Sequence, residues 1–411
     1  QKMSNSNPIH PDPDYAAWEA SEKEKWDALE AHMTPQFEGV RAYIEHAGAK
    51  YRAGVLGNMS AATAVDPDFP EFRTLFKGNS DNLVAQMRKD AYRNLRDWKP
   101  KLWDEMVAEQ DGLAETMRQC GVHVIRNEKC DTPDGLINMH DGWKSNKHMS
   151  VYAGPSFGRI TRNIYFNTWD NSATGTSEFH HRPGTLKLFE QNPDLVYYSL
   201  PYPEPNITVP GWGMLFQDVA GWRTMPDKHL LFGYGVSDAN VIPRVLEDIK
   251  YANSVTSAGI PQGADFMMRM LKREGFTHEM LFFDSRLTYH FDCFMMNIKE
   301  GVCGLPDLPD YGIWGGKLPE CIKDWEILRI PVEDIKNGAA NAITIGDGRV
   351  IIVRTAKETI KRMEKMGLEP IPVKYDKIWE YYHSGPDCSD ADVWRENDPV
   401  KPTPDGPPPL D

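Results

Sequence analysis

The sequence predicts one pseudo-symmetric α/β domain, because a helix pattern, a glycine and a short apolar run follow one another three times along the chain. The helix patterns cover Glu105–Cys120, Gly263–Glu274 and Thr355–Met366. The glycines that end them fit the left-handed position after a helix; in the same order they are Gly121, Gly275 and Gly367. The apolar runs that follow have the length and composition of strands; they cover Val122–Ile125, Met280–Phe283 and Leu368–Val373.

Two predicted hairpins complete the repeated unit. The clearer hairpin joins Ala342–Ile345 to Arg349–Val353 through a glycine-containing turn, directly before one of the helix patterns. The other joins Val219–Thr224 to His229–Phe232 and leads into a helix pattern over Ala239–Ala252. The chain therefore repeats a β-β-α-β unit. A doubly wound open sheet is the alternative that the same periodicity allows.

The two ends of the chain differ from this repeat. Residues Tyr15–Lys50 have a helical pattern with an apolar stripe formed by Trp18, Trp26, Leu29 and Phe37. The segment after Asp398 is rich in proline and has no periodicity, which is typical of a disordered end. We therefore expect an N-terminal helical extension over residues 1–45, a main domain over residues 46–394 and a proline-rich tail over residues 395–411.

Charge and cysteine usage exclude several classes of function. The formal net charge of −14, without a long basic run, argues against nucleic-acid binding. No stretch approaches the roughly 20 apolar residues of a membrane helix, and the polar start of the chain does not resemble a signal peptide. The six cysteines are too sparse for a disulfide scaffold and lack zinc-site spacing, so metal ligation is not expected. A cytoplasmic enzyme is the prediction.

Four residues could together perform thiol chemistry. His290 and Asp292 share one face of an expected strand over Phe291–Ile298, and Cys388 lies in a loop with glycine and proline. Asp218 opens the earlier hairpin, so it would occupy an equivalent strand end. A thiol nucleophile needs a base and an orienting carboxylate, which these residues supply. Each has a structural alternative: a hydrogen-bonded histidine, an unreactive loop cysteine and an aspartate that caps a turn.

Taken in order along the chain, these residues resemble the guanidino-group modifying (pentein) superfamily, and most closely its amidinotransferases. The similarity covers about residues 51–392. Arg52–Asn58 resembles the first strand of the family, and Glu109–Arg126 resembles its first helix, glycine and strand. His290-Phe291-Asp292 is similar to the H-x-D motif of the family. Asn341 precedes Cys388 by 47 residues, which is close to the family's spacing between that asparagine and the nucleophile.

The resemblance implies a fold and a site. The fold would be a five-bladed pseudo-symmetric α/β propeller with the N-terminal helical extension outside it. Cys388 would be the nucleophile and His290 the acid–base, with Asp218 and Asp292 holding the guanidinium group. Asn341 would line the pocket. The counterpart of an Arg-Asp pair that binds substrate in amidinotransferases would be the adjacent residues 162 and 163, which here are Arg162 and Asn163.

The resemblance also implies the reaction and its partners. An amidino group would move from an arginine-like guanidino donor to an acceptor amine through a covalent amidino-cysteine, with neither a metal nor an organic cofactor. A homodimer is compatible with this assignment. Two alternatives stay open: a hydrolase of arginine or methylarginine with the same fold, and a binding protein of this fold that has lost catalysis.

The remaining cysteines are expected to be structural and unpaired. They are Cys120, Cys130, Cys293, Cys303 and Cys321. Alternation along the expected strand would turn the Cys293 side chain away from the face that carries His290 and Asp292.

Overall fold

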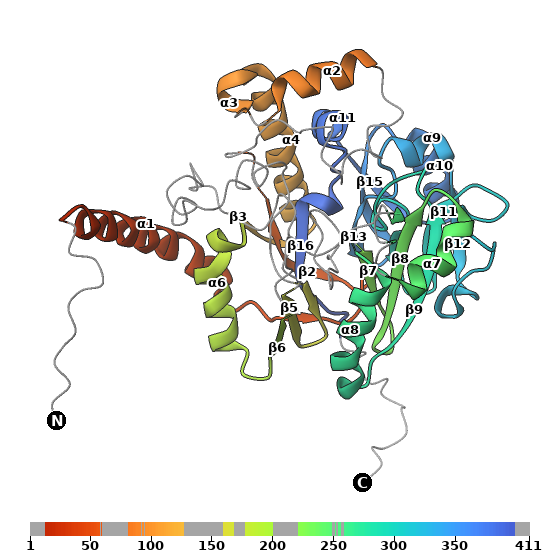
Figure 1. The fold of residues 1–411 in the computed structure, drawn as a ribbon, viewed down its shortest axis with the longest axis horizontal. Helices are drawn as coiled ribbons and strands as arrows, with labels where there is room; N and C mark the ends of the chain where they lie inside the picture. The colour runs from red at the N-terminus through yellow and green to blue at the C-terminus, as the bar shows by residue number, and fades with distance from the viewer. Residues whose placement is uncertain are drawn as a thin grey trace, which may run out of the picture.

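A computed structural model of the chain describes residues 13–57, 59, 81–91, 93, 95–126, 159–167, 177–199, 221–248, 251, 254–255 and 259–398. Its described strands form five small sheets (Figure 1). The largest sheet holds β1 (Tyr43–Ile44), β16 (Asp390–Arg395), β2 (Tyr51–Leu56) and β3 (His123–Arg126) in that spatial order. The other four sheets have three strands each. The first of these holds β4 (Arg159–Thr161), β5 (Ile164–Asn167) and β6 (Val196–Ser199), and the second holds β7 (Trp222–Met225), β8 (His229–Val236) and β9 (Thr277–Asp284). The third holds β10 (Met296–Lys299), β11 (Val302–Pro306) and β12 (Glu326–Ile330), and the fourth holds β13 (Ile343–Gly346), β14 (Arg349–Val353) and β15 (Glu369–Val373).

Every sheet repeats one pairing pattern, which confirms the predicted repeated unit. Two strands pair antiparallel, and a third strand joins the second in parallel. A parallel neighbour requires a crossover connection. Four of the sheets have helices in this crossover: α4 (Pro100–Gln119), α6 (Ser177–Gln191), α7 (Ile242–Glu247) with α8 (Pro261–Leu271), and α10 (Lys357–Lys365). The alternative of one doubly wound open sheet does not describe these strands.

The predicted helix ends are confirmed where glycine follows the helix. Gly121, Gly275 and Gly367 have φ angles of 87°, 84° and 73°. This left-handed conformation stops each helix and starts the turn into the next strand, because it lets the chain reverse without a Cβ penalty.

Two predicted helices are shorter in the structure. The pattern over Ala239–Ala252 forms the 3-10 helix η3 (Ala239–Val241) and α7, which stops because Asp248 adopts an extended conformation. The N-terminal pattern forms α1 (Pro13–Phe37). Gly39 follows with a φ of 73°, and Tyr43–Ile44 then pairs with β16, so the expected helix does not reach residue 50.

The N-terminal helix packs on the main body through apolar side chains near its C-terminal end. Leu29, Met33 and Phe37 are buried in a cluster with Ile160 and Leu188, from β4 and α6. Figure 1 shows α1 and α6 together on one side of the strands, and α9 (Val332–Lys336) and α10 on the other. The boundaries after residues 45 and 394 stay predictions, although β1 and Arg395 both belong to the largest sheet.

The remaining short elements lie on the connections. They are α2 (Asp81–Asp90), α3 (Leu95–Trp98), α11 (Asp376–Tyr382), and the 3-10 helices η5 (Lys272–Glu274), η6 (Glu320–Ile322) and η7 (Asp387–Ser389). Among the described residues, no helix combines the length and the apolar character needed to cross a membrane.

Candidate active site

The candidate nucleophile, Cys388, lies in η7, between α11 and β16. Two hydrogen bonds close the loop around it: the Tyr375 hydroxyl donates to Ser389 Oγ at 2.6 Å, and Ser389 Oγ donates to the Gly385 carbonyl at 3.1 Å. Both Tyr375 and Ser389 are fully buried. A short loop that is tied to the core at both sides can hold a reactive atom in place better than a free surface loop can.

Asn341 fixes Cys388 directly. Its Nδ2 donates to Cys388 Sγ at 3.0 Å, and its Oδ1 accepts from the Cys388 amide at 3.0 Å. Its side chain is fully buried, so these bonds do not compete with water. The structure therefore places Asn341 directly beside Cys388, and its role in the site stays a prediction.

One carboxylate, that of Asp292, lies between the thiol and the imidazole. Cys388 Sγ is 3.1 Å from Asp292 Oδ2, and His290 Nδ1 is 3.9 Å from Asp292 Oδ1. Asp292 and His290 are only 3% and 5% exposed, so the carboxylate is a buried charge site. The structure thus brings together four of the residues predicted from the sequence: Cys388, His290, Asp292 and Asn341.

The segment that carries His290 and Asp292 differs from the prediction. Residues 289–295 form bends and turns. The Cys293 amide donates to the His290 carbonyl, and the Met295 amide donates to the Phe291 carbonyl. The strand begins only at Met296. Alternation between the two sides of a strand therefore does not apply to the H-x-D residues.

The prediction for Cys293 is wrong for this reason. Its side chain turns toward the site: Asn341 Nδ2 lies 3.3 Å from Cys293 Sγ. The donor atoms of Cys293, Cys388 and Asp292 all lie within 4.8 Å of one another. Four of the five cysteines predicted to be unpaired are described, and they are free, as is Cys388; Cys130 lies outside the described residues.

His290 is neutral in this environment. Burial lowers the pKa of its imidazole to about 3, because a cation without solvent is strongly disfavoured. Its Nε2 is buried and has no hydrogen-bond partner in the part of the chain that the structure describes. A neutral imidazole with one uncommitted nitrogen can accept a proton during a reaction and return it later.

The carboxylate and the thiol hold their protons more tightly than usual. Burial raises the pKa of Asp292, with Asp387 adding to the effect and Arg223 opposing it. For Cys388, a hydrogen bond from Cys293 lowers the pKa, but burial and the carboxylates of Asp292 and Asp387 outweigh it and raise the pKa overall. Burial and the two carboxylates therefore disfavour the Cys388 thiolate.

Arg223 is a site residue that the sequence did not reveal. It lies on β7, is 3% exposed, and donates from Nη2 to Asp387 Oδ2 at 2.8 Å. This ion pair neutralises one of the acids next to Cys388. In the sequence, Arg223 is a basic residue inside a predicted strand. Strands with one solvent-exposed face also carry such residues, so the pattern does not indicate a buried ion pair.

Three predicted site residues are not among these contacts. Asp218 lies outside the described residues. Arg162 and Asn163 form the turn between β4 and β5, where Arg162 Nη1 donates to the Tyr43 hydroxyl and Asn163 Nδ2 donates to the Asp194 carbonyl. Their roles in substrate binding stay predictions.

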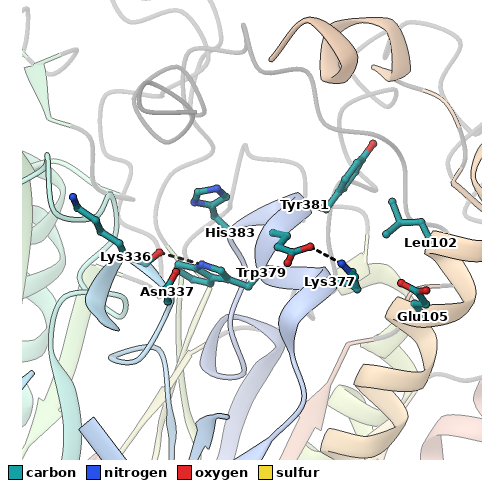
Figure 2. Close-up of a pocket in the computed structure, with 9 residues that line it drawn as sticks. Leu102, Glu105, Lys336, Asn337, Lys377, Trp379, Tyr381 and His383 are labelled. Carbon is teal, nitrogen blue, oxygen red and sulfur yellow. Dashed lines mark hydrogen bonds and ion pairs between the residues drawn. The ribbon is translucent and has the colours of Figure 1, made fainter. Parts of the chain in front are cut away.

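The structure also has a separate pocket of about 530 Å³ beside α11 (Figure 2). Side chains from α4, α11 and the end of α9 line it, and Trp379 Nε1 donates to the Lys336 carbonyl at its edge. Cys388, Asp292, Asn341 and His290 are not among its lining residues. The pocket is therefore separate from the Cys388 cluster.

Substitution of Gly385 tests whether activity depends on the position of the Asn341 side chain. A Cβ at Gly385 would lie 2.4 Å from Asn341 Oδ1 and 2.8 Å from its Cβ. We expect Gly385→Ala to displace Asn341 and lower activity by about 100-fold, since a misplacement of about 1 Å can cost that much. Steady-state kinetics checks this. Gly112→Ala in α4, where a Cβ meets nothing within 4 Å, is the control and should leave activity unchanged. Equal activity in both variants would contradict the role of Asn341.

The raised pKa of Cys388 predicts its labelling by iodoacetamide. Only the thiolate reacts, so labelling of Cys388 should rise at higher pH in the folded protein than in the denatured protein. A guanidinium compound bound beside Asp292 should move this rise to lower pH, because a nearby cation favours the thiolate. Peptide mass spectrometry after timed labelling measures both effects. Labelling at or below the pH of the denatured control, without ligand, would contradict the electrostatic account.

Solved structures match the fold of the chain, whereas sequence comparisons find no match. No family model matches the chain, and no curated protein matches its sequence. Among solved structures, SxtG, an amidinotransferase from Microseira wollei in the saxitoxin biosynthetic pathway, is similar with a TM-score of 0.64 and 14% identity. The inosamine-phosphate amidinotransferase from Streptomyces griseus has a TM-score of 0.57 and 14% identity. Each alignment covers 87% of this chain and 98% of the other.

The chain therefore has the fold of these two amidinotransferase structures, in line with the resemblance to the pentein superfamily seen in its sequence. Both of these structures are those of amidinotransferases. At this level of identity the likeness concerns the fold, so the activity has to be argued from the residues of the site.

Proposed function

We propose that the protein is a cysteine-dependent amidinotransferase that moves an amidino group from an arginine-like donor to an acceptor amine. One observation carries the proposal: Cys388 Sγ lies 3.1 Å from the buried carboxylate of Asp292 and is held there by Asn341. A planar cation with N–H donors satisfies such a carboxylate, and its central carbon then lies beside the sulfur.

The first half-reaction releases an amine. The guanidinium group of the donor binds Asp292, and its charge stabilises the Cys388 thiolate, which burial and the nearby carboxylates otherwise disfavour. Sulfur attacks the guanidinium carbon, and the bond from that carbon to the substituted nitrogen breaks. The proton of the thiol passes through His290 to the leaving amine, so the products are a neutral amine and a cationic amidino-cysteine.

The second half-reaction reverses these steps with another amine. The acceptor attacks the amidino carbon, the carbon–sulfur bond breaks, and the sulfur regains its proton through His290. The positive charge stays on the amidino group throughout, so Asp292 stays paired. Arg223 supports this role, because its ion pair with Asp387 leaves the charge of Asp292 free for the substrate. Asp218 remains the predicted second carboxylate for the guanidinium group.

We further infer that the five repeated units are the blades of a propeller. Contacts between successive sheets support this arrangement. Ile44 bridges to Arg162, Thr224 Oγ1 bonds Thr161 Oγ1, and Thr344 Oγ1 bonds the Asn297 carbonyl. Side chains from the β7–β9 and β10–β12 sheets share one apolar cluster. Arg395 of β16 donates to the Thr344 carbonyl of β13, which joins the last sheet to the largest one.

Reaction with the donor alone tests transfer. A transferase given a guanidino donor without acceptor should release one equivalent of amine per chain and then stop, because the amidino-cysteine waits for a second amine. Addition of an acceptor amine should restart turnover. Rapid-quench measurement of amine release, with ammonia and urea followed in parallel, gives the result. Continuous release of ammonia or of a urea product without acceptor would reject transfer and support the hydrolase alternative.

A further inference from the structure

A second cluster of potential ligands lies outside the Cys388 site. His229 starts β8, Glu279 lies on β9, and Cys321 lies in η6. The imidazole nitrogen, a carboxylate oxygen and the sulfur of these residues all lie within 4.8 Å of one another. The three residues share no member with the thiol cluster, and the amidino-transfer chemistry does not use them.

The spacing of His229 and Glu279 fits a shared ion. His229 Nε2 lies 3.4 Å from Glu279 Oε2, which is about the separation of two ligands around a tetrahedral zinc ion with bonds of about 2.0–2.1 Å. Nε2 is buried, and among the described residues it has no aligned hydrogen-bond partner. Because the two atoms form an ion pair without a well-aligned hydrogen bond, a zinc ion bound to both can replace their direct contact.

The outer hydrogen bonds of the cluster orient these groups as metal ligands. His229 Nδ1 lies 2.8 Å from Thr277 Oγ1, so Nδ1 can carry the proton and leave Nε2 with a free lone pair. The Glu279 carboxylate accepts from the amides of Glu320 and Cys321 at 2.9 Å each. Hydrogen bonds of this kind fix ligating histidines and carboxylates in known metal sites.

We propose that His229, Glu279 and Cys321 bind one zinc(II) ion. Nitrogen, oxygen and thiolate sulfur together suit zinc better than magnesium or calcium, which prefer oxygen alone. The Cys321 thiol loses its proton to solvent as the sulfur–zinc bond forms. The His229 and Glu279 side chains are partly exposed, at 16% and 26%, so the ion can enter and a water can fill the fourth position.

The bound ion would connect two neighbouring parts of the fold. His229 and Glu279 belong to the β7–β9 sheet, whereas Cys321 lies between β11 and β12. A ligand that binds only the folded chain stabilises it, so zinc should raise the unfolding temperature.

Zinc titration of the full chain in a Cys388→Ser background tests the proposal. This background removes one ligand of the other cluster, Asp292–Cys293–Cys388, whose donor atoms are also close enough to share an ion. Competition with a coloured chelator should give one zinc per chain, and cobalt(II) should give the absorption of a cobalt–thiolate bond. A further Cys321→Ser change should abolish that absorption and weaken zinc binding by at least about 100-fold, since even an outer-shell change costs about 10–100-fold.

Two matched variants in the same background complete the experiment. Cys120→Ser changes another half-buried free cysteine and should leave zinc affinity unchanged. Thr277→Val removes the exposed hydroxyl that orients His229 and should weaken zinc by about 10–100-fold without unfolding, as circular dichroism would verify. The absence of stoichiometric zinc binding in the background protein would overturn the proposal. So would equal zinc affinity in the Cys321→Ser, Thr277→Val and Cys120→Ser variants.

Discussion

Cys388→Ala is expected to lower amidino transfer by more than about 10⁴-fold, because loss of a nucleophile costs more than loss of acid–base assistance, which is typically about 10²–10⁴-fold. The donor should still bind, since the buried carboxylate of Asp292 remains and loses only its contact with the thiol. Amine release measures the first effect, and calorimetric titration of the inactive variant with the donor measures the second.

The matched control for this variant is Cys293→Ala. Cys293 lies in the same cluster, but its side chain is fully buried, whereas that of Cys388 is only partly buried. Loss of Cys293 removes a hydrogen bond that lowers the pKa of Cys388, so activity should fall only moderately and its pH dependence should move to higher pH. If Cys293→Ala abolished transfer while Cys388→Ala kept it, the nucleophile would have been assigned to the wrong thiol.

Asp292→Asn is expected to weaken donor binding and, at the same time, to make the Cys388 thiol more acidic. Loss of the carboxylate removes a charged hydrogen bond worth about 1.5–3 kcal/mol, so donor affinity should fall by about 10- to 100-fold. The same change removes a negative charge that raises the pKa of Cys388, so the thiol should become more acidic. Calorimetry and the pH dependence of alkylation measure the two effects separately.

A control shows that these effects belong to the site. Asp307→Asn changes a half-exposed aspartate that pairs with Arg362 and Arg329, and it should alter neither donor affinity nor the pKa of Cys388. A general loss of stability in Asp292→Asn would change the fraction of active protein and leave the acidity of the thiol as it was. An Asp292→Asn variant with unchanged donor affinity would remove this carboxylate from the guanidinium site.

The repeated unit could be predicted from the sequence because its signals are local. A helix pattern, a left-handed glycine such as Gly275 and a short apolar run occupy adjacent positions, and the same physics acts in each repeat. The clustering of Cys388, Asp292 and Asn341 could be predicted only through the resemblance, since nothing local specifies which loops meet. Asn341 and Cys388 are 47 residues apart and come together through tertiary packing.

Two features of the site differ from the prediction or are absent from it, and each has a physical reason. Alternation predicts the wrong side for Cys293 because it presumes a strand, whereas residues 289–295 form turns that direct its sulfur toward Asn341. The sequence does not single out Arg223, because its partner, Asp387, lies 164 residues further along the chain. A buried ion pair between distant segments leaves no periodic signal in the sequence.

The most direct test of the central claim is the mass of the intact protein after brief exposure to guanidino compounds, followed by peptide mapping. The account predicts that an arginine-like donor, given without acceptor, adds the mass of one amidino group to Cys388 in the unaltered protein. It predicts no such adduct in Cys388→Ala, and loss of the adduct when an acceptor amine is added. An adduct on another residue, or no adduct with any guanidino compound while the protein is folded, would contradict the account.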